Sequence, residues 1–316
     1  SSYLPDWVEE KSGGRIGARQ VQRIDLSELE EGGPARAADR ALLRRLATLA
    51  GNPVVVVDAE RPEHLVALAE AVRQLTTGEA SRRRGRPRRF LFQSAASLLT
   101  ALARLPPQPL DAAGLAALRR RDATGAALPG LVLVGSHVPL ADRQLEALLA
   151  ESGCGGVEVE VARVHRVLEG PLPDRLLASL EEEWLERLRA VQASGRTAVL
   201  HTSRGELSCR HATELRSLGL ALAGLMARLA GRLAGQLGYV ISKGGITTHT
   251  LLAEGLGLAA VDLQGQLLPG LSVVLTGGAF GRLPVLTFPG NLGVTGTLVE
   301  AWRWMENGEP GPIPPG

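Results

Sequence analysis

Short apolar runs recur along this chain and limit its fold more than any other feature. Five of them are bounded by Gly, Pro, Asn, Asp or Ser: Val54–Val57, Leu131–Val134, Thr197–Leu200, Tyr239–Ile241 and Ser272–Leu275. Each is followed by a longer stretch of helical periodicity or by a loop, which is typical of parallel strands buried on both faces. The pattern therefore predicts an α/β fold of two domains, with mostly parallel sheets flanked by helices.

The carboxyl ends of parallel strands share one sheet edge, where ligands usually bind. The residues expected at that edge are Asp58-Ala59, Gly135-Ser136, His201 to Arg204, Ser242 to Thr248 and Thr276 to Gly278. The most informative segment is Lys243 to His249, with the sequence KGGITTH, which leads into a helix-like stretch beginning at Thr250. Such a turn leaves backbone N–H groups unpaired at the positive end of a helix dipole. Its glycines admit an anion, its two threonines add hydroxyl donors, and Lys243 adds a charge.

The same turn has a purely conformational explanation, because strand-to-helix turns often carry glycine without binding a ligand. It is neither a Walker A loop nor a GxGxxG fingerprint. Two further turns favour the ligand-binding interpretation. One is Gly135-Ser136-His137, and the other is Phe288 to Gly293 (FPGNLG), between the predicted strand 284–287 and the predicted helix 297–306. Three such turns supply many N–H groups and few carboxylates, which suits an anionic ligand and a nucleotide above all.

Composition argues against several other functions. Aromatic residues make up 3% of the chain, too few for recognition mainly by stacking. The net charge of +2 is too small to indicate a nucleic-acid or membrane partner. Cys154 and Cys209 form neither a disulfide framework nor a metal motif, and no signal-peptide character precedes them, so a cytoplasmic location is expected. The most apolar stretch, Leu218–Leu237, carries Arg228 and Arg232 and is predicted to be a buried helix.

The chain of 316 residues is long enough for two domains. A proline-rich segment, Leu105–Pro109, marks the boundary. We predict a first domain at 1–108, a linker at 109–129, a second domain at 130–307 and a flexible tail at 308–316. The arginine-rich stretch Thr76–Arg89 is predicted to be a solvated loop before a strand at Phe90–Phe92. A nucleic-acid or phosphate role is the less favoured alternative, because no aromatic residues interleave with its arginines.

The order and spacing of these motifs resemble the four-carbon acid sugar kinases, a family with a sugar-binding and a nucleotide-binding domain. The resemblance to the nucleotide-binding domain rests on Val134-Gly135-Ser136, Arg143-Gln144-Leu145, Thr202-Ser203-Arg204, Lys243 to Thr247, Gly265-Gln266, Pro269-Gly270 and Phe288 to Gly293. Trp7 to Arg15 and Val57-Asp58-Ala59 look like the later part of the sugar-binding domain. The resemblance covers almost the whole chain.

The resemblance implies transfer of the ATP γ-phosphoryl group to a hydroxyl of a small acid sugar, such as a threonate or an erythronate, with Mg²⁺ as cofactor. By matching position, the nucleotide would contact Ser136, Gly244, Gly245, Ile246, Thr247, Gly290, Asn291 and Gly293. We expect Lys243 to neutralise phosphate charge, and we assign neither a catalytic base nor a metal ligand. The acid sugar and the nucleotide are the expected partners, and homo-oligomerisation is left open.

This chain departs from the family pattern in two ways. Many members have an acidic residue where this chain has Ile246, and Lys-x-Gly-Asn where it has Phe288 to Asn291. Nothing in this chain is similar to the Asp-Asp-x-Thr-Gly motif that opens the family's sugar-binding domain and helps to form the acid-sugar site. The alternatives are therefore a non-catalytic nucleotide-binding or regulatory homologue, or a protein that binds another phosphorylated metabolite through the same turns.

Four single residues at the predicted strand ends have two interpretations each. His201 and His249 could act in acid–base chemistry, or they could serve as surface or hydrogen-bonding residues. Asp58 could reach a cleft between domains, or it could cap the helix that begins at Pro62. Arg204 could bind a phosphate or a carboxylate, or it could form a structural salt bridge.

Overall fold

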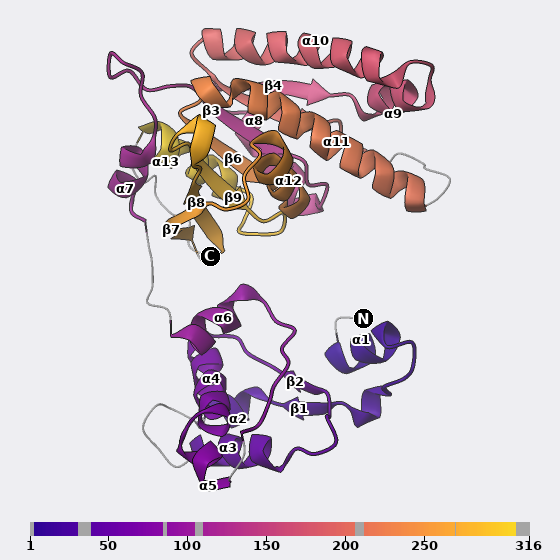
Figure 1. Ribbon diagram of the computed structural model, residues 1–316, viewed down its shortest axis with the longest axis vertical. Coiled ribbons are helices and arrows are strands. Elements are labelled where there is room, and N and C mark those ends of the chain that lie inside the picture. Colours follow the sequence, from indigo (N-terminus) through magenta and orange to yellow (C-terminus); the bar gives the residue numbers. More distant parts are fainter. Residues whose placement is uncertain are drawn as a thin grey trace. The chain divides into compact units, whose positions relative to one another are not determined.

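The computed structural model describes residues 3–30, 39–84, 87–104, 110–205, 212–268 and 270–307. Cys209, Pro269, the segment 105–109 and the predicted tail 308–316 lie outside these ranges. The chain divides into two compact units, Ser1–Pro107 and Gln108–Gly316. Both units combine strands with helices (Figure 1), so the α/β class is as predicted.

The first unit is built on two parallel strands, β1 (Gln22–Ile24) and β2 (Val55–Val57). Its helices are α1 (Leu4–Lys11), α2 (Leu26–Glu30), α3 (Asp39–Thr48), α4 (Pro62–Thr76), α5 (Glu79–Arg84) and α6 (Ala96–Ala103), and a 3-10 turn spans Ala18–Gln20. Apolar side chains of α3, α4 and α6 form a hydrophobic core with Ile24 of β1. This unit has its own core, independent of the larger sheet.

Two predictions for the arginine-rich region are wrong. The stretch Thr76–Arg89 is not a continuous loop, because α5 lies within it. Phe90–Phe92 is not a strand: its backbone is irregular and Leu91 is fully exposed. Phe90 packs against the core, and its ring centroid lies 6.1 Å from that of Phe92. An apolar core and an aromatic pair therefore hold this run without a neighbouring strand.

The second unit contains a seven-stranded sheet in the order β4-β5-β3-β6-β9-β8-β7. Its strands are β3 (Gly130–Val134), β4 (Cys154–Val159), β5 (Thr197–Thr202), β6 (Tyr239–Lys243), β7 (Asp262–Leu268), β8 (Leu271–Leu275) and β9 (Pro284–Phe288). The five strands β4, β5, β3, β6 and β9 are parallel, and β8 and β7 are antiparallel at one side. The sheet is mostly parallel, as predicted.

Helices cover both faces of this sheet (Figure 1). They are α7 (Ala112–Leu118), α8 (Pro139–Leu149), α9 (Val161–Glu169), α10 (Pro173–Ala193), α11 (Ala212–Leu233), α12 (Gly245–Thr250) and α13 (Thr297–Asn307). Leu131 and Leu133 of β3 face a core shared with α9, α10 and α11, whereas Val132 and Val134 face a core shared with α7, α8 and α13. Burial on both faces explains why the strand reads as an uninterrupted apolar run.

One strand direction was predicted wrongly. The run Ser272–Leu275 forms most of β8, which pairs with β9 in antiparallel register. The turn Thr276–Gly278 therefore lies at the opposite edge of the sheet from the carboxyl ends of the parallel strands. The turn between β7 and β8 instead reaches the carboxyl edge, where a Cβ added at Gly270 would lie 3.3 Å from Leu292.

Residues 110–129, for which we expected a linker, are associated with the second unit. Leu115 of α7 is completely buried in the core that α7 shares with α8 and α13. The Arg119 guanidinium donates to the carbonyls of Leu128 and Glu306 and pairs with the Glu306 carboxylate at 2.8 Å. Apolar burial and these charged hydrogen bonds hold the described part of this segment in place.

The helix over Thr213–Gln236 is long and apolar enough to cross a membrane, judged by length and composition alone. In its most apolar 18-residue window, however, 61% of the residues are buried inside the protein. A core helix of a globular protein has the same character. The predicted buried helix at Leu218–Leu237 corresponds to the end of α11 and the 3-10 turn Ala234–Gln236.

Candidate functional site

Three turns meet at the carboxyl ends of β3, β6 and β9, which are neighbours in the sheet. Ser136, in the turn after β3, lies close to the turns after β6 and β9. A Cβ added at Gly290 would lie 2.5 Å from the Ser136 hydroxyl oxygen, and one added at Gly244 would lie 3.4 Å from the Ser136 backbone nitrogen. We call the segments Gly135-Ser136, Gly244-Gly245 and Pro289-Gly290 the Ser136 turn cluster. Ser136 therefore packs against both glycines, most tightly against Gly290.

The backbone of the cluster is cross-linked by hydrogen bonds. The Gly244 N–H donates to the Phe288 carbonyl at 2.8 Å, and the Gly135 N–H donates to the Lys243 carbonyl at 3.3 Å. Gly244 has a φ of +117°, a backbone conformation that residues other than glycine rarely adopt. Glycine is therefore favoured here mainly by the backbone conformation, while an added Cβ would be in tight contact with the Thr247 hydroxyl oxygen at 3.0 Å.

Helix α12 begins directly after Gly244. Among the described residues, no acceptor receives the backbone N–H groups of Gly245, Ile246 or Thr247. The first N–H bonded in the helical manner is that of Thr248, which donates to the Gly244 carbonyl. Gly245 is exposed and has open space around it, so an anion can approach these three donors.

The two threonines of this turn do not both face the open side. The Thr248 hydroxyl lies 3.0 Å from the Ser242 carbonyl, to which it donates, so it binds inside the turn. Thr247 is only 6% exposed, and its Oγ1 lies beside Gly135 and Gly244. The predicted pair of outward hydroxyl donors is therefore not what the structure contains, and the unpaired backbone N–H groups are the donors that this turn offers to a ligand.

Lys243 lies beneath the cluster and not on its surface. Its side chain is completely buried, its ammonium donates to the Pro289 carbonyl at 3.1 Å, and it lies 4.0 Å from the centre of the Phe288 ring. Burial lowers the pKa of Lys243 to about 8. No carboxylate within the described ranges forms an ion pair with it. Lys243 thus supports the Pro289-Gly290 turn from below and adds positive potential there.

Arg204 is also used within the protein. Its guanidinium donates to the Ser136 carbonyl at 2.6 Å and lies 3.0 Å from the Asp142 carboxylate in the first turn of α8. Desolvation lowers the pKa of Arg204. The structural salt bridge is therefore the interpretation that the geometry supports, and Arg204 fixes the Ser136 turn from the side of β5.

The loop that follows β9 is held by a residue to which we assigned no role. Gln144 of α8 is completely buried, and its amide donates to the carbonyls of Leu292 and Val294 at 3.0 and 2.6 Å. Gly293 has a φ of +78°, and the Thr297 hydroxyl accepts from the Val294 N–H. Asn291 is exposed on the open side of this loop. The signal for Gln144 was present: it is a polar residue on the buried stripe of α8.

His201, one of the three histidines near the carboxyl edge, forms a hydrogen bond within the protein, and an acid–base role of His249 stays a hypothesis. The His137 ring nitrogen lies 2.9 Å from the Thr202 hydroxyl, and His201 is buried with its ring 3.2 Å from the Thr202 carbonyl. Burial lowers the pKa of both His137 and His201, which keeps them neutral at pH 7. His249 is exposed on α12.

In the first unit, Asp58 does not cap the helix that begins at Pro62. Its carboxylate lies 3.1 Å from the Arg23 guanidinium. The backbone N–H groups before α4 are instead accepted by the ring nitrogen of His64. This salt bridge across the two-stranded sheet replaces the capping interpretation, and the interpretation that Asp58 reaches a cleft between domains stays a prediction.

Carboxylates that could hold a metal ion are sparse around the cluster. Asp142 is paired with Arg204, and Ile246 is 66% exposed where an acidic side chain would face the ligand. Glu300, in the first turn of α13, is half-buried, and burial raises its pKa. A separate group of possible ligands, His165, Glu169 and Glu214, places ligand atoms within 4.8 Å of one another on α9 and α11. The described donors of the cluster itself therefore suit an anion better than a cation.

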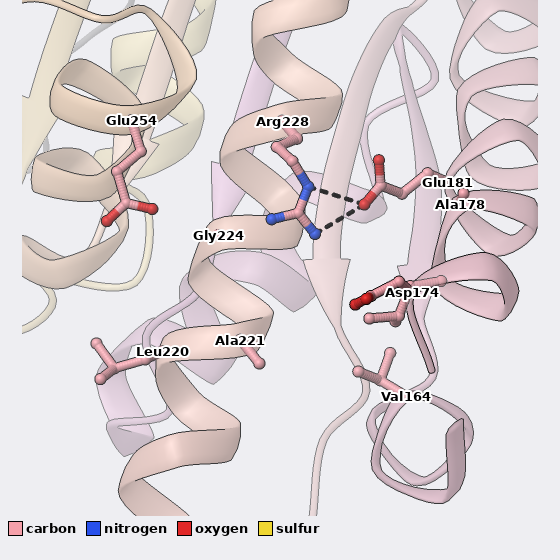
Figure 2. A pocket seen from close by; sticks show the side chains of 10 residues that line it. Val164, Asp174, Ala178, Glu181, Leu220, Ala221, Gly224, Arg228 and Glu254 are labelled. Carbon is pink, nitrogen blue, oxygen red and sulfur yellow. Dashed lines mark hydrogen bonds and ion pairs between the residues drawn. The ribbon is translucent and has the colours of Figure 1, made fainter. Parts of the chain in front are cut away.

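One cavity that the structure describes lies away from the Ser136 turn cluster. It lies among α9, α10, α11 and the π-helical turn Leu251–Gly255 that follows α12 (Figure 2). None of its lining residues belongs to the Ser136 turn cluster. The candidate anion site is thus an open sheet edge with backbone donors, whereas the cavity is a distinct feature.

Comparison with known proteins assigns both units to families of domains. Residues 131–298 match the model of a nucleotide-binding C-terminal domain, and residues 1–102 match that of a sugar-binding N-terminal domain. No curated protein matches the chain. The nucleotide-binding match spans the Ser136 turn cluster, Gln144 and Arg204.

One solved structure shares the fold at low sequence identity, and two others match with lower TM-scores. A Salmonella typhimurium LT2 protein provisionally described as a tRNA synthase is 20% identical, with a TM-score of 0.56, over 90% of this chain and 59% of its own. A DUF1537 protein from Bordetella bronchiseptica, a domain-swapped dimer with bound citrate, is 23% identical, with a TM-score of 0.45, over 91% and 59%. A DUF1537-family protein from Haemophilus influenzae is 17% identical, with a TM-score of 0.49, over 90% and 60%. The chain thus spans about three fifths of the length of these proteins.

Proposed function

Since this chain belongs to the four-carbon acid sugar kinase family (DUF1537), with a sugar-binding domain followed by a nucleotide-binding domain, we propose that it binds ATP at the Ser136 turn cluster. The phosphates would accept hydrogen bonds from the N–H groups of Gly245, Ile246 and Thr247. We further propose that the family's reaction, phosphoryl transfer from ATP to a hydroxyl of a small acid sugar, takes place in the protein to which this chain belongs.

The observation that carries the proposal is the convergence of three turns on Ser136, with unpaired N–H groups on the open side. Phosphoryl transfer depends mainly on positioning and on neutralising charge. Here Gly244 and Gly290 allow the turns to pack closely against Ser136, Gln144 holds the loop that carries Asn291, and Lys243 contributes a positive potential from below. Bound Mg²⁺ would neutralise charge on the phosphates.

A second candidate function has its own support. The exposed position 246 carries isoleucine, so the first turn of α12 offers backbone donors but no carboxylate for a metal ion. This combination suits a nucleotide-binding or regulatory homologue that does not catalyse transfer. The two candidates share the nucleotide site and differ in turnover.

The nucleotide site can be tested by a substitution that the fold tolerates. A Cβ at Gly245 would meet nothing within 4 Å, so Gly245→Asp leaves the packing unchanged but places a negative charge before the three N–H groups. Gly245→Asn is the matched neutral control. Thermal unfolding with Mg·ATP, Mg·GTP and phosphate would report binding, since a ligand at a hundred times its Kd stabilises by about 2.7 kcal/mol.

We expect ATP to raise the melting temperature of the wild type and of Gly245→Asn, and to have little effect on Gly245→Asp. Equal ATP responses in all three proteins would refute the site. If ATP binds, phosphate release and transfer with threonate and erythronate then separate the kinase from the non-catalytic homologue.

A further inference from the structure

The end of β6 carries a cation for which the described part of the chain supplies no counter-ion. The Lys243 side chain is completely buried, and its ammonium donates to the Pro289 carbonyl at 3.1 Å. Its other described contact is the face of the Phe288 ring, 4.0 Å away. An ammonium can donate to more than one acceptor, and a buried charge is ordinarily paired with a charge of opposite sign. Lys243 therefore has capacity for an anionic partner.

The elements packed around Lys243 do not provide that partner. Strands β3 and β9, which flank β6, contain no charged residue. Lys243 lies on the same face of β6 as Ile241, which faces the core shared with α7, α8 and α13. The charged residues of these helices are Asp142, Arg143 and Glu146 on α8 and Glu300, Arg303 and Glu306 on α13.

Most of these charges have partners elsewhere. Asp142 pairs with Arg204, and both Arg303 and Glu306 form ion pairs of their own. The titratable groups of the nearby turns are His137 and His249. Within the described ranges none of these groups forms an ion pair with Lys243, and burial alone lowers its pKa. The missing counter-charge must come from outside the described protein.

The position of Lys243 indicates where such a charge would bind. The carbonyl that it holds belongs to Pro289, a member of the Ser136 turn cluster, and the next residue along the chain is Gly244, another member. The proposed function places the several negative charges of ATP at this cluster. Attraction between a buried cation and an anion is stronger than in water, because the surroundings screen it less.

We propose that Lys243 is the counter-ion of the bound phosphates, and that the Lys243 amine takes up a proton from the solvent when ATP binds. The inference rests on the proposed nucleotide site. Linkage makes the effect reciprocal: the factor by which the ammonium increases the affinity for ATP is the factor by which ATP favours the ammonium over the amine. A pH that deprotonates Lys243 therefore weakens nucleotide binding.

The pH window follows from the free protein. Burial lowers the pKa of Lys243 to about 8, so above this value the protonated fraction falls about tenfold per pH unit. The Kd for ATP should then rise about five- to tenfold between pH 7.5 and pH 9. ATP is fully ionised throughout this window, since a phosphate loses its second proton at a pH of about 6.

The other nearby groups with shifted pKa values do not titrate in the same window. Burial lowers the pKa of His137, which therefore stays neutral, and burial raises the pKa of the Cys154 thiol to about 12. A change in ATP affinity between pH 7.5 and pH 9 thus reports on Lys243 once a variant without this lysine is compared.

Isothermal titration of the whole chain with Mg·ATP at pH 7.5, 8, 8.5 and 9 tests the proposal. Each titration is repeated in two buffers of different ionisation enthalpy, which gives the number of protons taken up per ATP bound. Lys243→Met removes the cation. Lys11→Met is the matched control, because it removes the other lysine of the chain at an exposed position. NMR of the wild type labelled with [ε-¹³C]lysine, with and without saturating ATP, is a second readout that needs no variant.

We expect the wild type and Lys11→Met to take up about half a proton per ATP at pH 8 and to lose affinity with rising pH as calculated. Lys243→Met should bind ATP about tenfold or more weakly at pH 7.5, with neither the pH dependence nor the proton uptake. In the NMR experiment, ATP should raise the pH at which the Lys243 signal titrates by about one unit or more.

Two kinds of failure are distinguishable. If the wild type binds ATP without proton uptake, and its Lys243 signal titrates at the same pH with and without ATP, the inference is overturned and the nucleotide site stands. The same conclusion follows if Lys243→Met and the wild type show equal affinities and parallel pH profiles. If the wild type binds no ATP at any of these pH values, the proposed nucleotide site is refuted, and the inference with it.

Discussion

Replacement of Lys243 by methionine should stabilise the second unit near neutral pH. Lys243 is completely buried, and its described partners are a carbonyl and an aromatic ring. Its pKa is lowered from 10.5 to about 8 because the ammonium loses hydration. A difference of about 2.5 in pKa corresponds to a cost of about 3 kcal/mol, at about 1.4 kcal/mol per unit. Methionine removes this cost but also the hydrogen bond, worth about 1 kcal/mol, so we expect a net gain of about 2 kcal/mol.

The same cost predicts how stability depends on pH. Because the pKa of Lys243 is lower in the folded state, the unfolded chain holds more protons between pH 8 and 10.5. The contribution of Lys243 to the free energy of unfolding of the wild type should therefore rise with pH between pH 8 and 10.5. Cys154 acts in the opposite direction, because burial raises the pKa of its thiol from 9.0 to about 12. It is present in both proteins, so the difference between wild type and Lys243→Met isolates the lysine.

Urea unfolding at pH 7, 8, 9 and 10 measures this difference, which should shrink as the pH rises. Lys11→Met is the control, since Lys11 is exposed and its replacement should leave the profile unchanged. The chain has only two lysines, so NMR of a sample labelled with [ε-¹³C]lysine gives two signals, one of which should titrate near pH 8. Parallel pH profiles of wild type and Lys243→Met, or two signals that both titrate near the ordinary value of about 10.4, would refute the reasoning. If Lys243 also orients the Pro289 carbonyl for nucleotide binding, the stabilised variant should bind ATP more weakly.

Two other buried polar residues give predictions that stability measurements can check. Gln144→Leu leaves the Leu292 and Val294 carbonyls without their donor, so urea unfolding should show a loss of about 1 to 3 kcal/mol; an unchanged midpoint would mean that water replaces the amide. Tyr239→Phe removes the hydroxyl that donates to Glu306 at 2.6 Å, and we expect a loss of about 1.5 to 3 kcal/mol; an unchanged midpoint would mean that the Thr197 hydroxyl, which also donates to Glu306, satisfies the carboxylate without Tyr239.

The strands and turns of the second unit could be predicted from local sequence, and their relations to other segments could not. The runs at β3, β5, β6 and β9 are apolar because both faces of the sheet are covered, so the sequence marks them clearly. The direction of β8 depends on its hydrogen bonds to β9, a nonlocal property that its apolar residues do not encode. Strand β4 was not recognised for a different, local reason, since Gly155 and Gly156 interrupt its apolar pattern.

The candidate site shows the same limit at the level of side chains. The sequence placed Gly244, Gly245 and Gly290 together because the ends of parallel strands meet at one edge. It could not tell that Lys243 is directed into the protein, since either face of β6 is buried. Arg204 likewise was equally consistent with a ligand and with a salt bridge until Asp142 was found beside it. Backbone features of the site were thus predictable, and the partners of its charged side chains were not.

The anion-binding and metal-binding parts of such a site are separable, and this chain supports that division. The features that suit a phosphate are close backbone packing at Gly244 and Gly290 and free N–H groups on α12, which do not depend on the side chain at position 246. The exposed Ile246 removes a carboxylate without disturbing them. Burial of the charged Lys243 side chain costs stability. Packing alone does not require a lysine at this position, because a methionine would fill the same space. A costly cation beneath an intact set of anion donors is the combination expected where binding of a phosphate has been retained.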